Sequence, residues 1–235
     1  MTDCLFCKIQ KPGYEKEIVY QNQFFYATRD SYPVTKLHTL IIPKRHFASY
    51  FDMNQDEQAS VFEILKQQQN EILNLDPKNS AANIALAEYY RVNNNHLKAF
   101  DYLTFCFDND VFDLQTVFQI LSSYFQMAID EQKYLDPLLS LLDKALINHP
   151  NEAPFHVLSG DVYFQLNNSK KAFEAYEKSL SFGVTDFLIW NRYLILGVEL
   201  QEYDRVYKNG LRAIELHPIQ PTLYLFTFVN NPSAI

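Results

Sequence analysis

Cysteine and histidine are the residues of this chain whose types could support chemistry, because thiolates act as nucleophiles and metal ligands and imidazoles act as bases. Cys4 and Cys7 form a C-x2-C pair, and Cys106 stands alone between two phenylalanines. An odd number of cysteines argues against a disulfide framework. The six histidines are dispersed, and no two of them are separated by a single residue: His38, His46, His96, His149, His156 and His217.

The glycines exclude another kind of site. The chain has 5 glycines among 235 residues, where average usage predicts roughly 16. Neither the G-x-G-x-x-G pattern nor the P-loop pattern occurs, so nucleotide binding through a glycine-rich phosphate loop is excluded. Few glycines together with abundant Tyr, Phe, Leu and Ala favour helices packed on helices.

The charge distribution limits the partners. The formal net charge is -8, and the basic residues cluster no further than Lys44-Arg45 and Lys170-Lys171, so no nucleic-acid partner is expected. No stretch of 18 apolar residues is free of charge, which predicts no membrane span. The first ten residues lack the basic and apolar regions of a signal peptide, and this predicts a cytoplasmic location.

Strand signals are confined to residues 14–50. Residues 18–20 and 24–28 are rich in β-branched and aromatic side chains around the polar sequence Gln-Asn-Gln, which predicts a hairpin. Residues 37–42 are apolar at nearly every position and are closed by Pro43, which predicts a third strand covered on both faces. A long helix is expected to begin at Gln55 and to end at Leu75, before Asp-Pro.

The remainder reads as a helical repeat. Pro77, Pro150 and Pro218 occur in similar contexts and are 73 and 68 residues apart, each close to twice a 34-residue period. Such a unit needs small side chains where its two helices approach most closely. The unit that starts at Ala153 supplies Gly160 for this purpose.

Other units fit the same frame. The unit starting at Ser80 has Ala87 and Ala99 at the two small positions, and the unit starting at Phe187 has the chain's only Trp at its fourth position. The unit between them, roughly residues 112–150, is a few residues too long. Its turn between helices is therefore expected to be expanded around residues 131–136. The asparagine runs at 93–95 and 167–168 are expected at turns, because Asn tolerates left-handed backbone.

Residues 80–218 resemble the tetratricopeptide repeat (TPR) family. The resemblance implies an α-solenoid whose first helices line a concave groove that docks a protein or peptide. The second, fifth and ninth positions of each unit are expected to face this groove: Ala81, Ile84, Glu88, Pro154, Val157, Asp161, Leu188, Asn191 and Ile195. This mixture of apolar and acidic residues suits a peptide with some positive charge.

The first sixty residues carry a second resemblance, through Cys-Leu-Phe-Cys-Lys-Ile at 4–9, Asp-Ser-Tyr-Pro-Val at 30–34 and His-Thr-Leu-Ile-Ile-Pro-Lys-Arg-His at 38–46. This stretch is similar to the first half of the histidine triad (HIT) family of nucleotide hydrolases and transferases. The resemblance implies that Asp30 contacts ribose, that His38 lines the active site, and that Cys4, Cys7 and His46 are ligands of a structural zinc.

The family's His-x-His-x-His motif, which carries the nucleophile, is absent. Catalysis is therefore not expected. The family's fourth zinc ligand is also absent. Two alternatives remain for the Cys-His set: an incomplete zinc site completed by water or a carboxylate, and reduced, inert thiols. His38 is either a hydrogen-bonded structural histidine or a remnant of the active site.

The sequence thus predicts a mainly α protein: a truncated HIT-like fragment of about three strands (1–54), a capping helix (55–79), and about four TPR-like units plus a C-terminal helix (80–235). It further predicts a fusion or rearranged chain. The expected function is a non-catalytic scaffold, with self-association through the incomplete sheet as an additional interaction. The alternatives are a nucleoside-phosphate hydrolase or transferase and a nucleotide binder without turnover.

Overall fold

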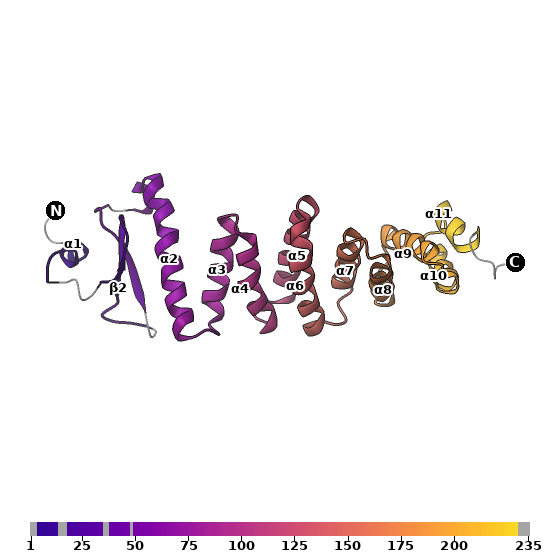
Figure 1. Ribbon diagram of the computed structural model, residues 1–235, viewed down its shortest axis with the longest axis horizontal. Helices are drawn as coiled ribbons and strands as arrows, with labels where there is room; N and C mark the ends of the chain where they lie inside the picture. Colours follow the sequence, from indigo (N-terminus) through magenta and orange to yellow (C-terminus); the bar gives the residue numbers. More distant parts are fainter. Residues whose placement is uncertain (1–3, 14–17, 35–37, 48, 230–235) are drawn as a thin grey trace. The chain divides into compact units, whose positions relative to one another are not determined.

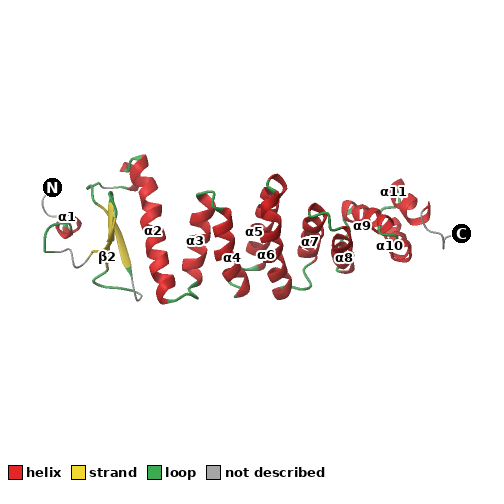
Figure 2. Cartoon of the chain, in the orientation of Figure 1, coloured by secondary structure: helices red, strands yellow, loops and turns green. Residues whose placement is uncertain are grey.

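The computed structural model describes residues 4–13, 18–34, 38–47 and 49–229. Their backbone contacts divide the chain into two units, 1–105 and 106–235, and all described strands belong to the first (Figure 2). The elements of unit 1 are α1 (Leu5–Ile9), β1 (Ile18–Gln21), β2 (Phe25–Arg29), β3 (Thr39–Pro43), η2 (Tyr50–Asp52), α2 (Gln55–Leu75) and α3 (Ser80–Val92). Helix α4 (His96–Asp108) crosses the boundary.

The sequence predicts three strands, and the structure arranges them as an antiparallel sheet in the order β1-β2-β3. The hairpin turn is held by Asn22, whose side-chain oxygen accepts from the backbone N–H groups of Phe24 and Phe25 at 3.0 and 2.8 Å. Residues 39–43 form the third strand. The expected start of this strand, Leu37, lies outside the described residues, and His38 precedes β3 rather than lying within it.

Both faces of the sheet are covered, which explains why its strands are apolar at consecutive positions. On one face, Tyr26 of β2 packs with Ile9 of α1 and Ile42 of β3. On the other face, Phe25 and Ala27 pack with Ile64 of α2. Side chains alternate across a strand, so each cover takes alternate residues of β2. The sheet is therefore a small layer between α1 and α2.

Helix α2 has the bounds that the sequence predicts, and its N-terminus is fixed by a capping box. Asn54 Oδ1 accepts from Glu57 N at 2.8 Å, and Asn54 N donates to Glu57 Oε2 at 2.9 Å. The same carboxylate receives two hydrogen bonds from Arg45, at 2.8 and 2.7 Å. Together Arg45 and the Asn54 N–H lower the pKa of Glu57 to about 2. The helix start is thereby tied to the segment that follows β3.

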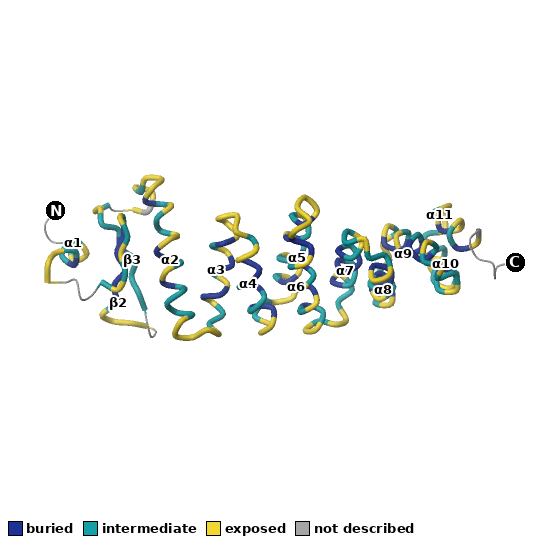
Figure 3. The backbone as a smooth tube through the Cα atoms, viewed as in Figure 1, coloured by how far each residue is buried: buried dark blue, intermediate teal, exposed yellow. Residues whose placement is uncertain are grey.

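Unit 2 consists of consecutive helices that contact one another from α5 to α10 (Figure 1). Its elements are α5 (Leu114–Asp130), η3 (Gln132–Tyr134), α6 (Leu135–Asn148), α7 (Ala153–Gln165), α8 (Ser169–Ser181), α9 (Phe187–Glu199), α10 (Tyr203–Leu216), α11 (Pro221–Tyr224) and η4 (Leu225–Val229). Buried positions recur along these helices (Figure 3). This succession of helix pairs is the TPR-like architecture expected from the sequence.

The unit with the expanded turn is also as predicted. Helix α5 has 17 residues, whereas α7 and α9 have 13 each, and the short helix η3 follows α5. No described helix is both long enough and apolar enough to cross a membrane.

Glycine allows close contacts between helices of unit 2. A Cβ added at Gly160 would lie 2.5 Å from the ring of Tyr176 in α8, and one added at Gly197 would lie 2.3 Å from Val206 in α10. Gly160 is the small position that the repeat frame predicts. In the last pair, the position that corresponds to Gly160 holds the large residue Leu194, which is fully buried. The close contact between the helices is therefore made one helical turn later, at Gly197.

The turns inside the helix pairs use left-handed backbone, as expected from the asparagines. Asn94 and Asn167 both have φ of 56°. Gln201, in the turn before α10, has φ of 61°, although glutamine is not one of the residues that favour left-handed backbone.

Candidate functional site

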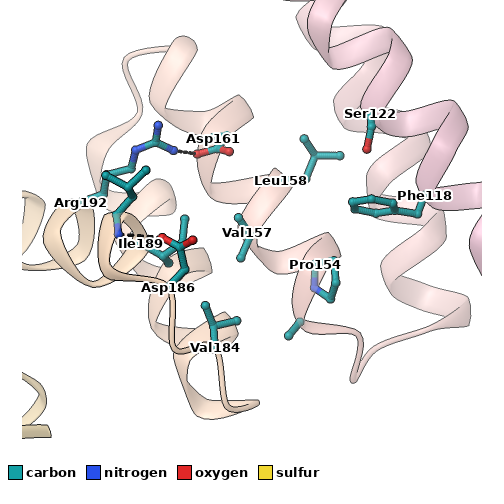
Figure 4. Close-up of a pocket in the computed structure, with 12 residues that line it drawn as sticks. Phe118, Ser122, Pro154, Val157, Leu158, Asp161, Val184, Asp186, Ile189 and Arg192 are labelled. Atoms are coloured by element: carbon teal, nitrogen blue, oxygen red, sulfur yellow. Dashed lines mark hydrogen bonds and ion pairs between the residues drawn. The ribbon is translucent and has the colours of Figure 1, made fainter. Parts of the chain in front are cut away.

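A cavity of unit 2, about 430 Å³, lies among the first helices of three consecutive pairs (Figure 4). Helices α5, α7 and α9 and the turn before α9 supply its lining residues: Phe118, Ser122, Ala153, Pro154, Val157, Leu158, Asp161, Val184, Asp186, Leu188, Ile189 and Arg192. Helix α7 contributes more of them than any other element, because residues three and four apart share one face of a helix. Its Pro154, Val157 and Asp161 have this spacing.

Most of the cavity wall is apolar. Leu158 and Ile189 are buried, with 7% of each residue exposed, and form part of the core as well as of the wall. Phe118 and Leu188 are 42% and 60% exposed. Large apolar side chains that stay this exposed in a concave surface can lose further contact with water if a ligand covers them.

One edge of the cavity is polar. The Asp161 carboxylate forms an ion pair with Arg192 of α9 and accepts a hydrogen bond from the Tyr176 hydroxyl at 2.6 Å. Burial and the nearby carboxylate raise the pKa of Tyr176. Burial lowers the pKa of Arg192, but the Asp161 charge and the interactions with Tyr176 together outweigh this effect and raise the pKa. Asp161 therefore joins α7, α8 and α9, while the half-exposed Arg192 presents its charge at the cavity edge.

The groove residues expected from the sequence lie in different places. Val157 and Asp161 line the α5–α7–α9 cavity, whereas Asn191 and Ile195 of α9 are not among its lining residues. Ile84 and Glu88 belong to α3 in unit 1. There Glu88 lines a separate apolar cavity of about 400 Å³ between α2 and α3.

The carboxylate of Glu88 is paired with Arg91 of the same helix through two hydrogen bonds of 2.7 Å. Sequence reasoning missed Phe118 and Arg192. Phe118 takes the fifth position of the repeat frame only when the unit begins at Leu114, the first residue of α5, rather than near residue 112 as the sequence suggests.

Unit 1 holds a cluster of thiol and imidazole groups. The ligand atoms of Cys4, Cys7 and His46 all lie within 4.8 Å of one another, and Cys7 Sγ is 3.4 Å from His46 Nδ1. Backbone N–H groups, that of Cys7 first, lower the pKa of Cys4, whereas burial raises that of Cys7. Two thiols and an imidazole are the donor set that Zn²⁺ favours. The three residues predicted as zinc ligands are thus close enough to share one ion.

Hydrogen bonds around the cluster fix α1 against the sheet. The Tyr26 hydroxyl donates to the Phe6 carbonyl at 2.6 Å, and Gln10 Nε2 donates to the Lys44 carbonyl at 3.1 Å. Burial, with a smaller effect of the two thiols, raises the pKa of Tyr26 to about 12, so its hydroxyl remains a donor. By contrast, Cys106 lies alone in the helical region, and burial raises its pKa to about 11.

Asp30 and His38 also meet, in the connection between β2 and β3. His38 Nδ1 lies 3.1 Å from Asp30 Oδ2, and Asp30 N donates to the His38 carbonyl at 3.0 Å. The other carboxylate oxygen accepts from Tyr32 N at 3.0 Å. Both side chains therefore participate in the local structure of this connection, and each is only partly exposed.

Comparison with known proteins identifies the N-terminal similarity. Residues 3–97 match the family described as scavenger mRNA decapping enzyme C-term binding. A HIT-like protein of Methanocaldococcus jannaschii is 37% identical over 54 residues, which are 23% of this chain and 42% of that protein. The N-terminal part of the chain is HIT-like in sequence. A HIT-like protein of Borreliella burgdorferi is 37% identical over 73 residues, 30% of this chain and 50% of that protein.

The chain spans half or less of the length of these relatives. The family match extends beyond the strands, over α2 and α3. The sequence nevertheless lacks the His-x-His-x-His motif, because no two of its six histidines are separated by one residue.

Solved structures of helical-repeat proteins are similar to the chain as well. A thermophilic TPR protein of Thermus thermophilus has 20% identity and a TM-score of 0.39, over 73% of this chain and 91% of that one. MamA has 20% identity and a TM-score of 0.42, over 71% and 96%. Both likenesses are weak, and the assignment of helical repeats given above depends on the helix pairs themselves.

Proposed function

We propose that this chain is a non-catalytic interaction protein whose α5–α7–α9 cavity holds an apolar side chain of a protein or peptide partner. The observation that carries this proposal is the exposed apolar surface of Phe118 and Leu188 in a concave site of about 430 Å³. Burial of this surface by a partner would contribute about 25 cal/mol of binding free energy for each Å² of apolar area removed from water. Arg192 adds a polar group at the edge that can orient the partner.

Peptides selected from a random library against the full chain would test this proposal. The informative variant is Leu188→Gln, which removes exposed apolar surface from the cavity. The matched control is Leu216→Gln, since Leu216 is also a helical leucine of unit 2, is 46% exposed and does not line the cavity. Leu188→Gln should weaken binding at least tenfold, which is about 1.4 kcal/mol, and Leu216→Gln less than twofold. Equal effects of the two variants would remove the cavity from the binding surface.

The absence of catalysis is the second part of the proposal. It is supported by the missing His-x-His-x-His motif, because covalent transfer needs a nucleophile oriented by a partner group. Incubation with an adenosine phosphoramidate or a dinucleoside polyphosphate should give no turnover above background. Turnover that copurifies with the chain and survives in a Leu188→Gln variant would identify an enzyme.

Nucleotide binding without turnover is the second candidate function, and the HIT-like similarity over residues 3–97 favours it. In this alternative Asp30 contacts the ribose. A thermal-shift screen with adenosine and guanosine monophosphates tests it, with Asp30→Asn as the variant. The alternative requires a saturable increase in melting temperature that Asp30→Asn abolishes.

The third part of the proposal concerns zinc, which Cys4, Cys7 and His46 would hold. Their clustering within 4.8 Å and their soft donor atoms support this assignment. The ion would join α1 to the segment after β3 and would stabilise unit 1. Metal analysis of chain purified without chelator should give about one zinc per chain, and Cys7→Ser should abolish it, whereas Cys106→Ala should not.

A further inference from the structure

The cluster of Cys4, Cys7 and His46 offers three ligands, one fewer than a structural zinc site usually has. In the part of the chain that the structure describes, no fourth His, Cys, Asp or Glu joins Cys4, Cys7 and His46. Zinc in proteins is almost always four-coordinate, and sites with three protein ligands leave the fourth position to water or to an external ligand. Counted over the described residues, the cluster therefore has the donor number of an open site.

The cluster is also accessible. His46 is exposed, and Cys4 and Cys7 are each partly exposed. Two neighbours in α1, Leu5 and Phe6, are 61% and 42% exposed. A ligand from outside can thus approach the three donor atoms over an apolar surface without displacing the core that lies between α1 and the sheet.

The surroundings indicate which ligand the position would take. Two thiolates and a neutral imidazole would balance the charge of Zn²⁺, so the softness of the donor atoms already present decides the preference of the position. A thiolate is matched in softness to a site that already contains two sulfur atoms.

We infer that the metal held by Cys4, Cys7 and His46 keeps one exchangeable coordination position that takes a thiolate, either from a small thiol or from a cysteine of a protein partner. This inference rests on the proposed zinc site. In the exchange a metal–sulfur bond forms, the ligand that held the position leaves, the thiol proton passes to the buffer, and no electron is transferred.

Cobalt substitution of the full chain tests this inference, because the sulfur-to-cobalt charge-transfer absorbance grows with the number of thiolates. The starting spectrum should be that of two thiolates. Addition of 2-mercaptoethanol should raise the charge-transfer absorbance about 1.5-fold in a saturable way, since the thiolate count changes from two to three. Ethanol at the same concentration should have no effect. The Cys106→Ala variant should respond like the parent chain.

A short peptide with one cysteine, and its serine counterpart, distinguish the two sources of thiolate. Tighter binding of the cysteine peptide than of 2-mercaptoethanol assigns the position to a protein partner, and equal or weaker binding assigns it to small thiols. If cobalt and zinc do not bind in stoichiometric amount, the zinc site itself is wrong. If the metal binds but the spectrum does not respond to thiol, or already shows three thiolates, the zinc site stands and the exchangeable position is refuted.

Discussion

Substitution of Gly160 by alanine tests the packing of the helix pair α7–α8 in the most direct way. The added Cβ would lie 2.5, 2.6 and 2.9 Å from three ring atoms of Tyr176. Contacts this short cannot persist, and Tyr176 cannot move aside easily because it is fully buried and its hydroxyl is bonded to Asp161. Overpacking of this kind costs about 3 kcal/mol, while alanine gains about 1 kcal/mol in a helix over glycine. We therefore expect Gly160→Ala to lower the free energy of unfolding by about 2 kcal/mol.

Urea unfolding followed by Trp fluorescence measures this effect in unit 2. The only Trp of the chain, Trp190, belongs to the same buried cluster as Tyr176. The sign of the change should depend on the ring: in a Tyr176→Leu background, Gly160→Ala should stabilise the protein by up to about 1 kcal/mol, because the clash is gone and the helix propensity remains. A Gly160→Ala protein as stable as the parent chain would refute the reasoning.

Three further predictions concern other parts of the chain. Gln201→Gly should raise the free energy of unfolding by about 1 kcal/mol in the same fluorescence assay, since glycine has no penalty for the left-handed backbone at φ 61°. A loss of stability would show that contacts of the Gln201 side chain contribute more than the relief of this backbone penalty. Glu57 has a pKa lowered from 4.5 to about 2 by Arg45 and by the helix cap, so its contribution to stability should be complete above pH 4.5 and should disappear as the pH falls towards 2. Circular dichroism melts should show a smaller acid-induced loss in Glu57→Gln, and an unchanged loss would contradict the capping argument. Chelation of bound zinc should lower the melting temperature of the parent chain but not of Cys7→Ser, and equal melting curves with and without chelator would argue against a structural role for the metal.

Much of the fold follows from local signals. The bounds of α2 are predictable because Asn54 and Glu57 form a capping box and Asp76-Pro77 prevents continuation. The turns at Asn94 and Asn167 are predictable because asparagine is the common non-glycine residue in left-handed backbone. The Gln201 turn is not, because the fold imposes this conformation against the preference of the residue.

The candidate site is less accessible to sequence reasoning. The repeat frame places Val157 and Asp161 in the cavity correctly, since i, i+4 spacing fixes one face of α7. It does not reveal that Arg192, rather than Asn191, reaches the cavity edge, because the angle between α7 and α9 decides which side of α9 faces inward. Nor does it show that Asp161 already binds Tyr176 and Arg192, which makes this carboxylate part of the structure as well as of the surface.

The central claim is that a partner binds in the α5–α7–α9 cavity, and a photo-cross-linking amino acid at selected positions measures it most directly. The cross-linker replaces Leu188 in one protein and Leu216 in another, and each is irradiated with the peptide selected against the full chain. Cross-linked peptide at position 188, with little or none at 216, is the result that the account predicts. Cross-linking at 216 and not at 188, with both proteins folded, would contradict it.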